Sequence, residues 1–265
     1  MLSDQVEGGT KRPVFTPSLA VDTDVYTRNV RSALDRDLPE VVHCAPHNHV
    51  LSIAGGGPSI ANTYQQLDGY VVGINGSLQW LADNGVRTFA CGLLDPRPRI
   101  ADNLLVDKNV RYFVSTTCSP EVFDKLEGCQ VTTFTPSGIP EVEETLRERK
   151  PNDWLTIGGG ATMGLRWIML GVMLGFRHFK LHGLDSSFAP DATHAYPDVK
   201  DGDTRSFFIS RGRLTSVDML QQVAEFFETL ELLGGIPNLK IEVFGDGLLQ
   251  DAWAVYRRGH PRRFA

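Results

Sequence analysis

Polar side chains follow several apolar runs of this chain, at the points where strands would end. Asp185 comes shortly after the run at 178–182, and His194 lies nine positions further on, in a long polar segment. Asp95 follows another apolar run and has arginines two and four positions later. A carboxylate is a potential divalent-metal ligand and arginines bind phosphate, so this loop suits a phosphorylated ligand. An ordinary Asp-Pro turn with solvated arginines explains the same residues about as well.

Two glycine clusters are the other candidates for chemistry. The first comprises Gly55, Gly56, Gly57, Pro58 and Ser59, and the second comprises Gly158, Gly159, Gly160 and Thr162. Glycines let a backbone approach a ligand closely, and a helix that begins after them directs free N–H groups at an anion. The first cluster is not the dinucleotide fingerprint, because Ile60 stands where the third glycine would be, and no lysine follows it as in a Walker loop. A tight turn between a strand and a helix explains these glycines about as well as a phosphate site does.

Two weaker signals accompany the glycines. Asn75 follows the run at 70–74, where its amide is suited to a base or sugar edge, although capping the next helix is an equally simple role. His43, His47 and His49 lie close together, but their spacing fits no common zinc finger and the intervening proline forbids a regular helix. We therefore interpret these histidines as loop residues.

Apolar runs and helical periodicity alternate along the chain. Strands are expected at 50–54, 70–74, 88–93, 111–115, 130–134, 154–157, 178–182 and 239–244. Helices are expected at about 24–36, 58–67, 77–84, 120–126, 141–150, 161–175 and 214–233. This alternation predicts an α/β, Rossmann-like, mostly parallel sheet with helices on both faces. Both glycine turns and the Asp185 loop then face one crevice at the carboxyl edge of the strands.

The chain is expected to divide into two parts. Residues 1–40 form an N-terminal arm and a helix, and residues 41–265 form the Rossmann-like domain. That domain carries a long polar loop at 189–213, which we interpret as a lid that brings His194 and Tyr196 over the site. The basic stretch at 257–263 is interpreted as a solvated tail.

Composition sets limits on the class of protein. With 265 residues and 42% hydrophobic content, the chain can bury a large core, and a net charge of -6 argues against a nucleic-acid-binding surface. The four cysteines show no CxxC spacing and are expected to be reduced. The N-terminus lacks a signal peptide pattern, and the apolar stretch at 161–175 is too short to span a bilayer. We expect a cytoplasmic protein without a membrane partner.

Six motifs in order carry a family resemblance: LSIAGGGPSI, VVGIN, LLDPRP, TIGGGATMGLRWIMLGVMLGF, LHGLDSS and THAY. With them, the chain resembles the 6-hydroxymethylpterin diphosphokinase MptE-like family over about residues 45–200. That family is similar to motility accessory factors and to bacterial sialyltransferases that use nucleotide-activated sugars. The elements LPEVVHCAPHNH and STTCSPEVFDKL look more like a phage or prophage branch.

The resemblance implies a role for each candidate residue. Asn75 and the first glycine turn, at Gly56, Gly57, Pro58 and Ser59, look like nucleotide contacts, and Gly158, Gly159, Gly160 and Thr162 look like the other half of the cradle. Asp95 and Asp185 match acidic positions suited to Mg²⁺, and His194 matches a histidine that acts as general base, with Asp185 the next candidate to accept the proton.

Three functions follow from these roles. The first is transfer of a diphosphate from ATP to a hydroxymethylpterin-like acceptor, assisted by Mg²⁺. The second is a glycosyltransferase that uses a nucleotide-activated sugar, and the third is a nucleotide-binding protein without catalysis. The expected partners are a small-molecule nucleotide and its acceptor, with homo-oligomerisation left open.

Overall fold

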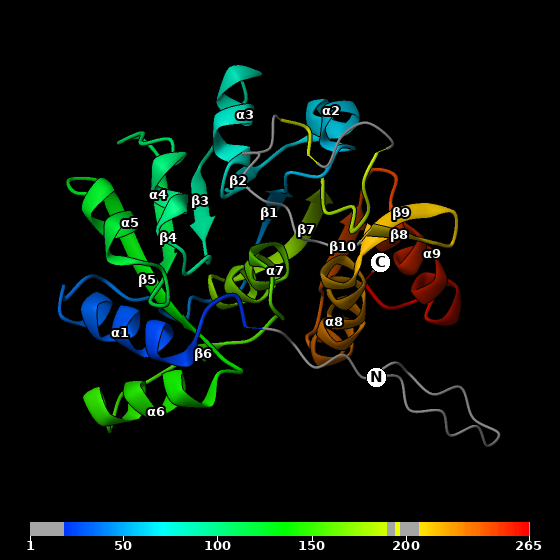
Figure 1. Ribbon diagram of the computed structural model, residues 1–265. Helices are drawn as coiled ribbons and strands as arrows, with labels where there is room; N and C mark the ends of the chain where they lie inside the picture. Colours follow the sequence, from blue (N-terminus) through cyan, green and yellow to red (C-terminus); the bar gives the residue numbers. More distant parts are fainter. Residues whose placement is uncertain (1–18, 190–193, 197–206, 265) are drawn as a thin grey trace.

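Eight parallel strands form a single sheet at the centre of the molecule (Figure 1). The computed structural model describes residues 19–189, 194–196 and 207–264. The strand order is β10-β7-β1-β2-β3-β4-β5-β6. The bounds are β1 His47–Ala54, β2 Tyr70–Ile74, β3 Ala90–Leu93, β4 Arg111–Ser115, β5 Gln130–Pro136, β6 Thr156–Ile157, β7 Phe176–His182 and β10 Lys240–Val243. The predicted α/β Rossmann-like fold is confirmed.

Helices cover both faces of this sheet. The described helices are α1 Thr23–Leu34, α2 Ile60–Thr63, α3 Ser77–Asp83, α4 Arg99–Asp102, α5 Pro120–Lys125, α6 Pro140–Arg149, α7 Met163–Met173, α8 Val217–Leu233 and α9 Leu248–Gly259, with a 3-10 turn at Tyr64–Gln66. Successive strand residues point to opposite faces. Ile53 therefore joins the core beneath α7 and α8, whereas Ala54 packs with residues of α2 and α3. Helix α1 packs against α5 and α6.

Helix α7 is the apolar helix expected at 161–175. It connects β6, at one edge of the sheet, to β7, which pairs with β1, and on its way it contacts β1, β3 and α8. Leu165, Trp167 and Leu170 are fully buried. Because the sheet covers one side of α7 and α8 covers the other, an apolar surface all round is what this helix requires.

The region expected to be a loop at 189–213 contains a hairpin instead. Strands β8 Phe207–Ser210 and β9 Arg213–Ser216 pair antiparallel, and residues 190–193 and 197–206 lie outside the described residues. The predicted helix start at 214 is also wrong, because β9 continues to Ser216 and α8 begins after it. Ser216 caps α8 by accepting a hydrogen bond from the Met219 N–H at 3.4 Å.

Two further interpretations are corrected at the ends of the sheet. The basic stretch at 257–263 is not a solvated tail, because Arg257 lies in α9 and Arg263 forms a 3.0 Å ion pair with Glu231 of α8. His47 and His49 lie in strand β1 rather than in a loop, with ring centroids 5.0 Å apart. Within the described ranges, no helix has the length and apolar character that crossing a membrane requires.

Candidate functional site

The carboxyl ends of β1 and β7 lie side by side at the point where the strand order reverses. After β1 the chain adds β2 to β6 on one side, and it then returns to place β7 on the other side of β1. Open α/β sheets bind ligands in the crevice at such a switch point. The first glycine turn follows β1 and Asp185 follows β7, so the sheet brings these two candidates together.

The Asp185 carboxylate holds the first glycine turn. Its Oδ2 accepts a hydrogen bond from the Ser59 N–H at 2.8 Å, and its Oδ1 accepts one from the Ser59 hydroxyl at 2.5 Å. The Gln250 amide of α9 donates to Oδ1 at 3.3 Å. Burial raises the pKa of Asp185, and the hydrogen bonds from Ser59 lower it in part.

Gly57 is required where the turn meets the Asp185 loop. Its N–H donates to the Gly183 carbonyl at 2.8 Å. A Cβ on Gly57 would lie 2.6 Å from Asp185 Oδ2 and 2.7 Å from the Gly183 oxygen. Both distances are shorter than a carbon and an oxygen tolerate, so only glycine allows this approach of the two segments.

Residues 194–196 lie against the first glycine turn. The Ala195 N–H donates to the Gly56 carbonyl at 3.0 Å, and the His194 ring stacks on Tyr196 with centroids 5.3 Å apart. Tyr196 is also close to Gly76, where a Cβ would lie 3.1 Å from its ring. His194, Ala195 and Tyr196 therefore lie beside the first glycine turn.

Asn75 is not a helix cap. Gly76 occupies the N-cap position of α3, and Asn75 itself has a φ of 48°. This left-handed conformation is tolerated by asparagine and is found at functional sites more often than elsewhere. Its side-chain Oδ1 is buried and accepts no hydrogen bond from the part of the chain described. An unsatisfied acceptor beside the glycine turn suits a ligand that donates a hydrogen bond.

The second glycine turn is linked to this site through Gln222 of α8. It follows β6, at the same edge of the parallel sheet, but four strands separate β6 from β1. The Gln222 amide donates to the Thr162 hydroxyl at 3.0 Å and accepts from the Ser186 hydroxyl at 2.9 Å. The N-terminus of α7 also approaches the site, because a Cβ on Gly164 would lie 2.6 Å from Leu184.

Part of the second glycine turn is already occupied by a carboxylate. Glu225 of α8 accepts a hydrogen bond from the Ala161 N–H at 2.8 Å, and a Cβ on Gly160 would lie 2.4 Å from Glu225. This carboxylate, like Gln222 and Gln250, was not identified in the sequence. All three belong to amphipathic helices. The sequence of such a helix does not indicate which of its polar residues will contact the end of a distant strand.

Within the described residues, the Asp95 and Asp185 carboxylates each accept hydrogen bonds from other groups of the chain. The Asp95 carboxylate accepts from the Arg97 Nε at 2.7 Å and from a second guanidinium nitrogen, and this pairing raises the pKa of Arg97. Asp185 is engaged by Ser59 and Gln250. No group of three His, Cys, Asp or Glu residues suited to a metal ion occurs within the described ranges. In the described part of the chain, the donor set therefore does not fit Mg²⁺ held by these two carboxylates.

The raised pKa of Asp185 predicts a pH-dependent difference in stability. The ordinary value is 3.8, so the folded state keeps this proton to a higher pH than the unfolded chain does. Asp185 therefore contributes to stability at pH values below 3.8, the ordinary pKa of an aspartate. This contribution is lost as the pH rises through the higher pKa that Asp185 has in the folded state. Asp185→Asn removes the titration. Its free energy of unfolding, from urea denaturation, should therefore improve relative to the parent chain as the pH rises from about 4.

The control for this measurement is Asp153→Asn, which changes an exposed carboxylate. The difference in free energy of unfolding between Asp153→Asn and the parent chain should not increase with pH in the way expected for Asp185→Asn. A difference for Asp185→Asn that stays constant across the series would contradict the prediction.

Comparisons with known proteins bear on the fold. No family model and no curated protein matches this chain. It is similar to the structure of the MAf glycosyltransferase from Magnetospirillum magneticum AMB-1, with a TM-score of 0.62 and 17% identity over 84% of this chain. The match spans 36% of the length of that protein. At this identity the similarity establishes the fold, and the MptE-like family and the phage branch stay predictions.

A second structure is more distant. The sialyltransferase CstII from Campylobacter jejuni, in complex with the substrate analogue cytidine-5'-monophosphate, has a TM-score of 0.36 and 15% identity. The match covers 78% of this chain and 84% of that one.

Proposed function

We propose that this protein is a nucleotide-dependent transferase that moves a sugar from a nucleotide-activated donor to a hydroxyl acceptor. The observation that carries the proposal is the engagement of Asp185 by Ser59. A carboxylate that holds the glycine turn is not available to hold a cation on a triphosphate. Neutralisation of phosphate charge then falls to backbone N–H groups, which suits a nucleotide sugar better than diphosphate transfer from ATP.

The nucleotide would be held at the crevice between β1 and β7. The first glycine turn gives its phosphate a close approach to the backbone, and Asn75 accepts a hydrogen bond from the base or the sugar. The N-terminus of α7, an eleven-residue helix, contributes free N–H groups and the positive end of its dipole.

His194 would act as the general base. As the bond between the sugar and the phosphate oxygen breaks, the nucleotide leaves with the electron pair. The acceptor oxygen forms the new bond to the sugar, and His194 takes its proton. The position of residues 194–196 on the glycine turn supports this assignment.

The similarity of fold to a MAf glycosyltransferase agrees with this proposal. The diphosphokinase hypothesis used the same residues but required Asp95 and Asp185 as metal ligands. Both carboxylates make hydrogen bonds within the chain instead. The geometry therefore favours the glycosyltransferase over the diphosphokinase.

A thermal-shift screen tests the proposal. The melting temperature is measured with CMP, UDP, ADP, ATP and GTP, each with and without Mg²⁺. A ligand of the folded state stabilises it by about 2.7 kcal/mol at a hundredfold excess over its dissociation constant. We expect stabilisation by CMP or UDP that does not depend on Mg²⁺. In a separate activity assay, the same nucleotide should be released from its sugar conjugate.

Matched asparagine variants complete the test. Asn75→Ala should lose most of the shift, whereas Asn238→Ala should keep it, because Asn238 has a similar φ of 58° but is exposed in a turn. Stabilisation by ATP alone and only with Mg²⁺ would favour the diphosphokinase. No shift with any nucleotide would rule out both transferases.

A further inference from the structure

The second glycine turn is built around a carboxylate from another helix. The Ala161 N–H donates to Glu225 Oε2 at 2.8 Å, and the Gln221 amide of α8 donates to Glu225 Oε1 at 2.9 Å. Gly160 has a φ of 80°, and a Cβ on it would overlap with Glu225 Oε2. Glycine is therefore required at this position, so that the carboxylate can approach the backbone.

Two features of α7 call for a negative charge at this turn. The helix has no acidic residue in its first turn, although a carboxylate near the positive end of a helix dipole is stabilising. Arg166, the fourth residue of α7, is only 6% exposed, and its guanidinium donates to the Ile157 and Ser137 carbonyls rather than to a carboxylate. Burial lowers the pKa of Arg166 to about 10, and the charge of Glu225 acts in the opposite direction. Glu225 therefore supplies, from α8, the negative charge that this end of α7 lacks.

Helix α8 connects Glu225 to the candidate site. Gln222 lies three positions before Glu225 and therefore on the same face of the helix. The Gln222 amide accepts from the Ser186 hydroxyl at 2.9 Å and donates to the Thr162 hydroxyl at 3.0 Å. Ser186 belongs to the loop after β7, and Thr162 directly follows the residue whose N–H holds Glu225. One row of polar contacts along α8 thus extends from the crevice to the second glycine turn.

We propose that Glu225 makes the transferase selective for donors whose sugar carries no negative charge. This inference rests on the proposed function, in which the donor phosphates lie at the first glycine turn and at the start of α7. The sugar, attached to those phosphates, extends toward the second turn, where Glu225 takes the position of an anion. A carboxylate on the sugar would meet a like charge there, and the buried Arg166 is engaged by carbonyls. A neutral sugar has hydroxyls that donate to Glu225 instead.

Calorimetric titration of the full chain with matched donors tests this selectivity. UDP-glucose and UDP-glucuronate differ only in a hydroxymethyl group, which is a carboxylate in the second. The parent chain should bind UDP-glucose at least ~10-fold more tightly than UDP-glucuronate, because like charges oppose binding of the acidic donor. CMP and CMP-N-acetylneuraminate are compared in the same way, and the acidic conjugate should bind more weakly than CMP itself.

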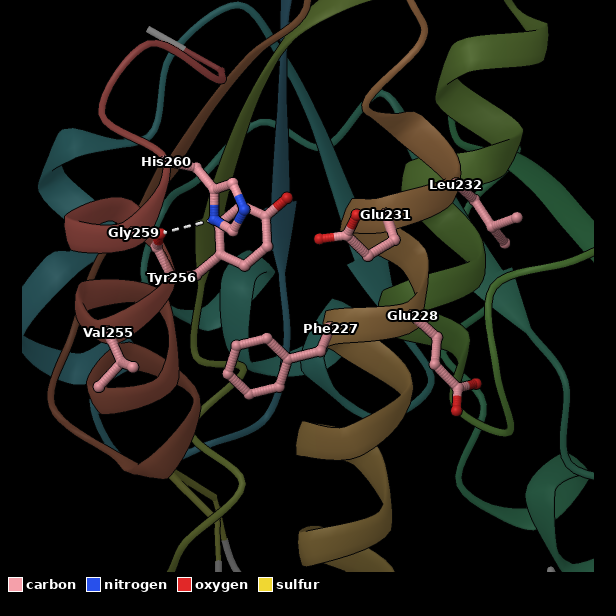
Figure 2. A pocket seen from close by; sticks show the side chains of 8 residues that line it. All are labelled: Phe227, Glu228, Glu231, Leu232, Val255, Tyr256, Gly259 and His260. Atoms are coloured by element: carbon pink, nitrogen blue, oxygen red, sulfur yellow. Dashed lines mark hydrogen bonds between the residues drawn. The ribbon is translucent and has the colours of Figure 1, made fainter. Parts of the chain in front are cut away.

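Variants of Glu225 separate its charge from its shape. Glu225→Gln should reduce the preference for UDP-glucose to within about threefold, because it removes the element that acts against the acidic donor. Glu225→Asp keeps the charge and should keep the preference. Glu228→Gln is the control for net charge, since Glu228 lies on the same helix but lines a hollow between α8 and α9 that includes no residue of the turn (Figure 2). A purely structural role of Glu225 would change the affinities for both donors alike and leave their ratio unchanged.

The outcomes distinguish this inference from the proposed function. Equal or tighter binding of an acidic donor by the parent chain would overturn the selectivity and leave the transferase in place. An unchanged preference in a folded Glu225→Gln chain would do the same, and the parent comparison decides alone if that variant does not fold. Failure of every nucleotide and conjugate to bind would overturn both proposals.

Discussion

Replacing His194 with alanine is expected to lower kcat by roughly 10²–10⁴-fold, with nucleotide affinity within a few-fold of the parent value. The proposed base takes a proton in the transition state and contributes little to binding of the nucleotide. Residues 194–196 lie on the glycine turn through the hydrogen bond from Ala195 to Gly56, which alanine at 194 leaves in place. Initial rates of nucleotide release from its sugar conjugate measure kcat, and calorimetry measures affinity.

The matched control is His49→Ala, since His49 is exposed at the amino end of β1, the edge opposite to the site. Its kcat should equal that of the parent. If His194→Ala retains turnover within a few-fold, His194 is not the base. Asp185 would then be the next candidate, and a kcat measured for Asp185→Asn would decide.

Gly57→Ala is expected to lower nucleotide affinity more than tenfold and to destabilise the chain by about 1–3 kcal/mol, as insertion of a methyl group into a packed site does. The added carbon would meet Asp185 Oδ2 at 2.6 Å and the Gly183 carbonyl at 2.7 Å. One of the two segments must move, and the hydrogen bonds of Ser59 to Asp185 move with it. Calorimetric titration and urea denaturation measure the two effects.

Gly235→Ala serves as the comparison, because a Cβ there meets nothing within 4 Å and its φ is not positive. That variant should match the parent in both measurements. A Gly57→Ala chain that loses stability but binds nucleotide normally would show that the turn is structural only.

Most strands of the fold could be predicted because apolar runs end at glycine or polar residues. The hairpin β8–β9 could not, since its two-residue turn is Arg211-Gly212. Both residues have positive φ, at 50° and 78°, which is the type I′ geometry that Asn-Gly usually signals. Arginine in the first position gave no such signal. Helix α9 was also missed, because its arginines made the segment look like a tail.

The candidate site could be predicted only in part. Each side of the crevice could be predicted from neighbouring residues in the sequence, because Gly57 and Asp185 each follow an apolar strand. The side chains that hold the crevice together come from later helices: Gln250 donates to Asp185, and Gln222 connects Ser186 with Thr162. These are long-range contacts between ordinary polar residues, and spacing along the chain carries no information about them. The pairing of Asp95 with Arg97 could have been predicted from the sequence, because the two residues are only two positions apart.

The contact between Ser59 and Asp185 also has a consequence for folding. The two residues are 126 positions apart, and Gln250 adds a contact 65 positions further along the chain. Strands β1 to β6 pair with neighbours in sequence order, whereas β7 must return across the sheet to reach β1. Closing so long a loop is entropically costly, so contacts of this kind form late and slow the folding of the chain. During synthesis from the N-terminus, the contact between Ser59 and Asp185 would therefore remain unformed until residue 185 had left the ribosome.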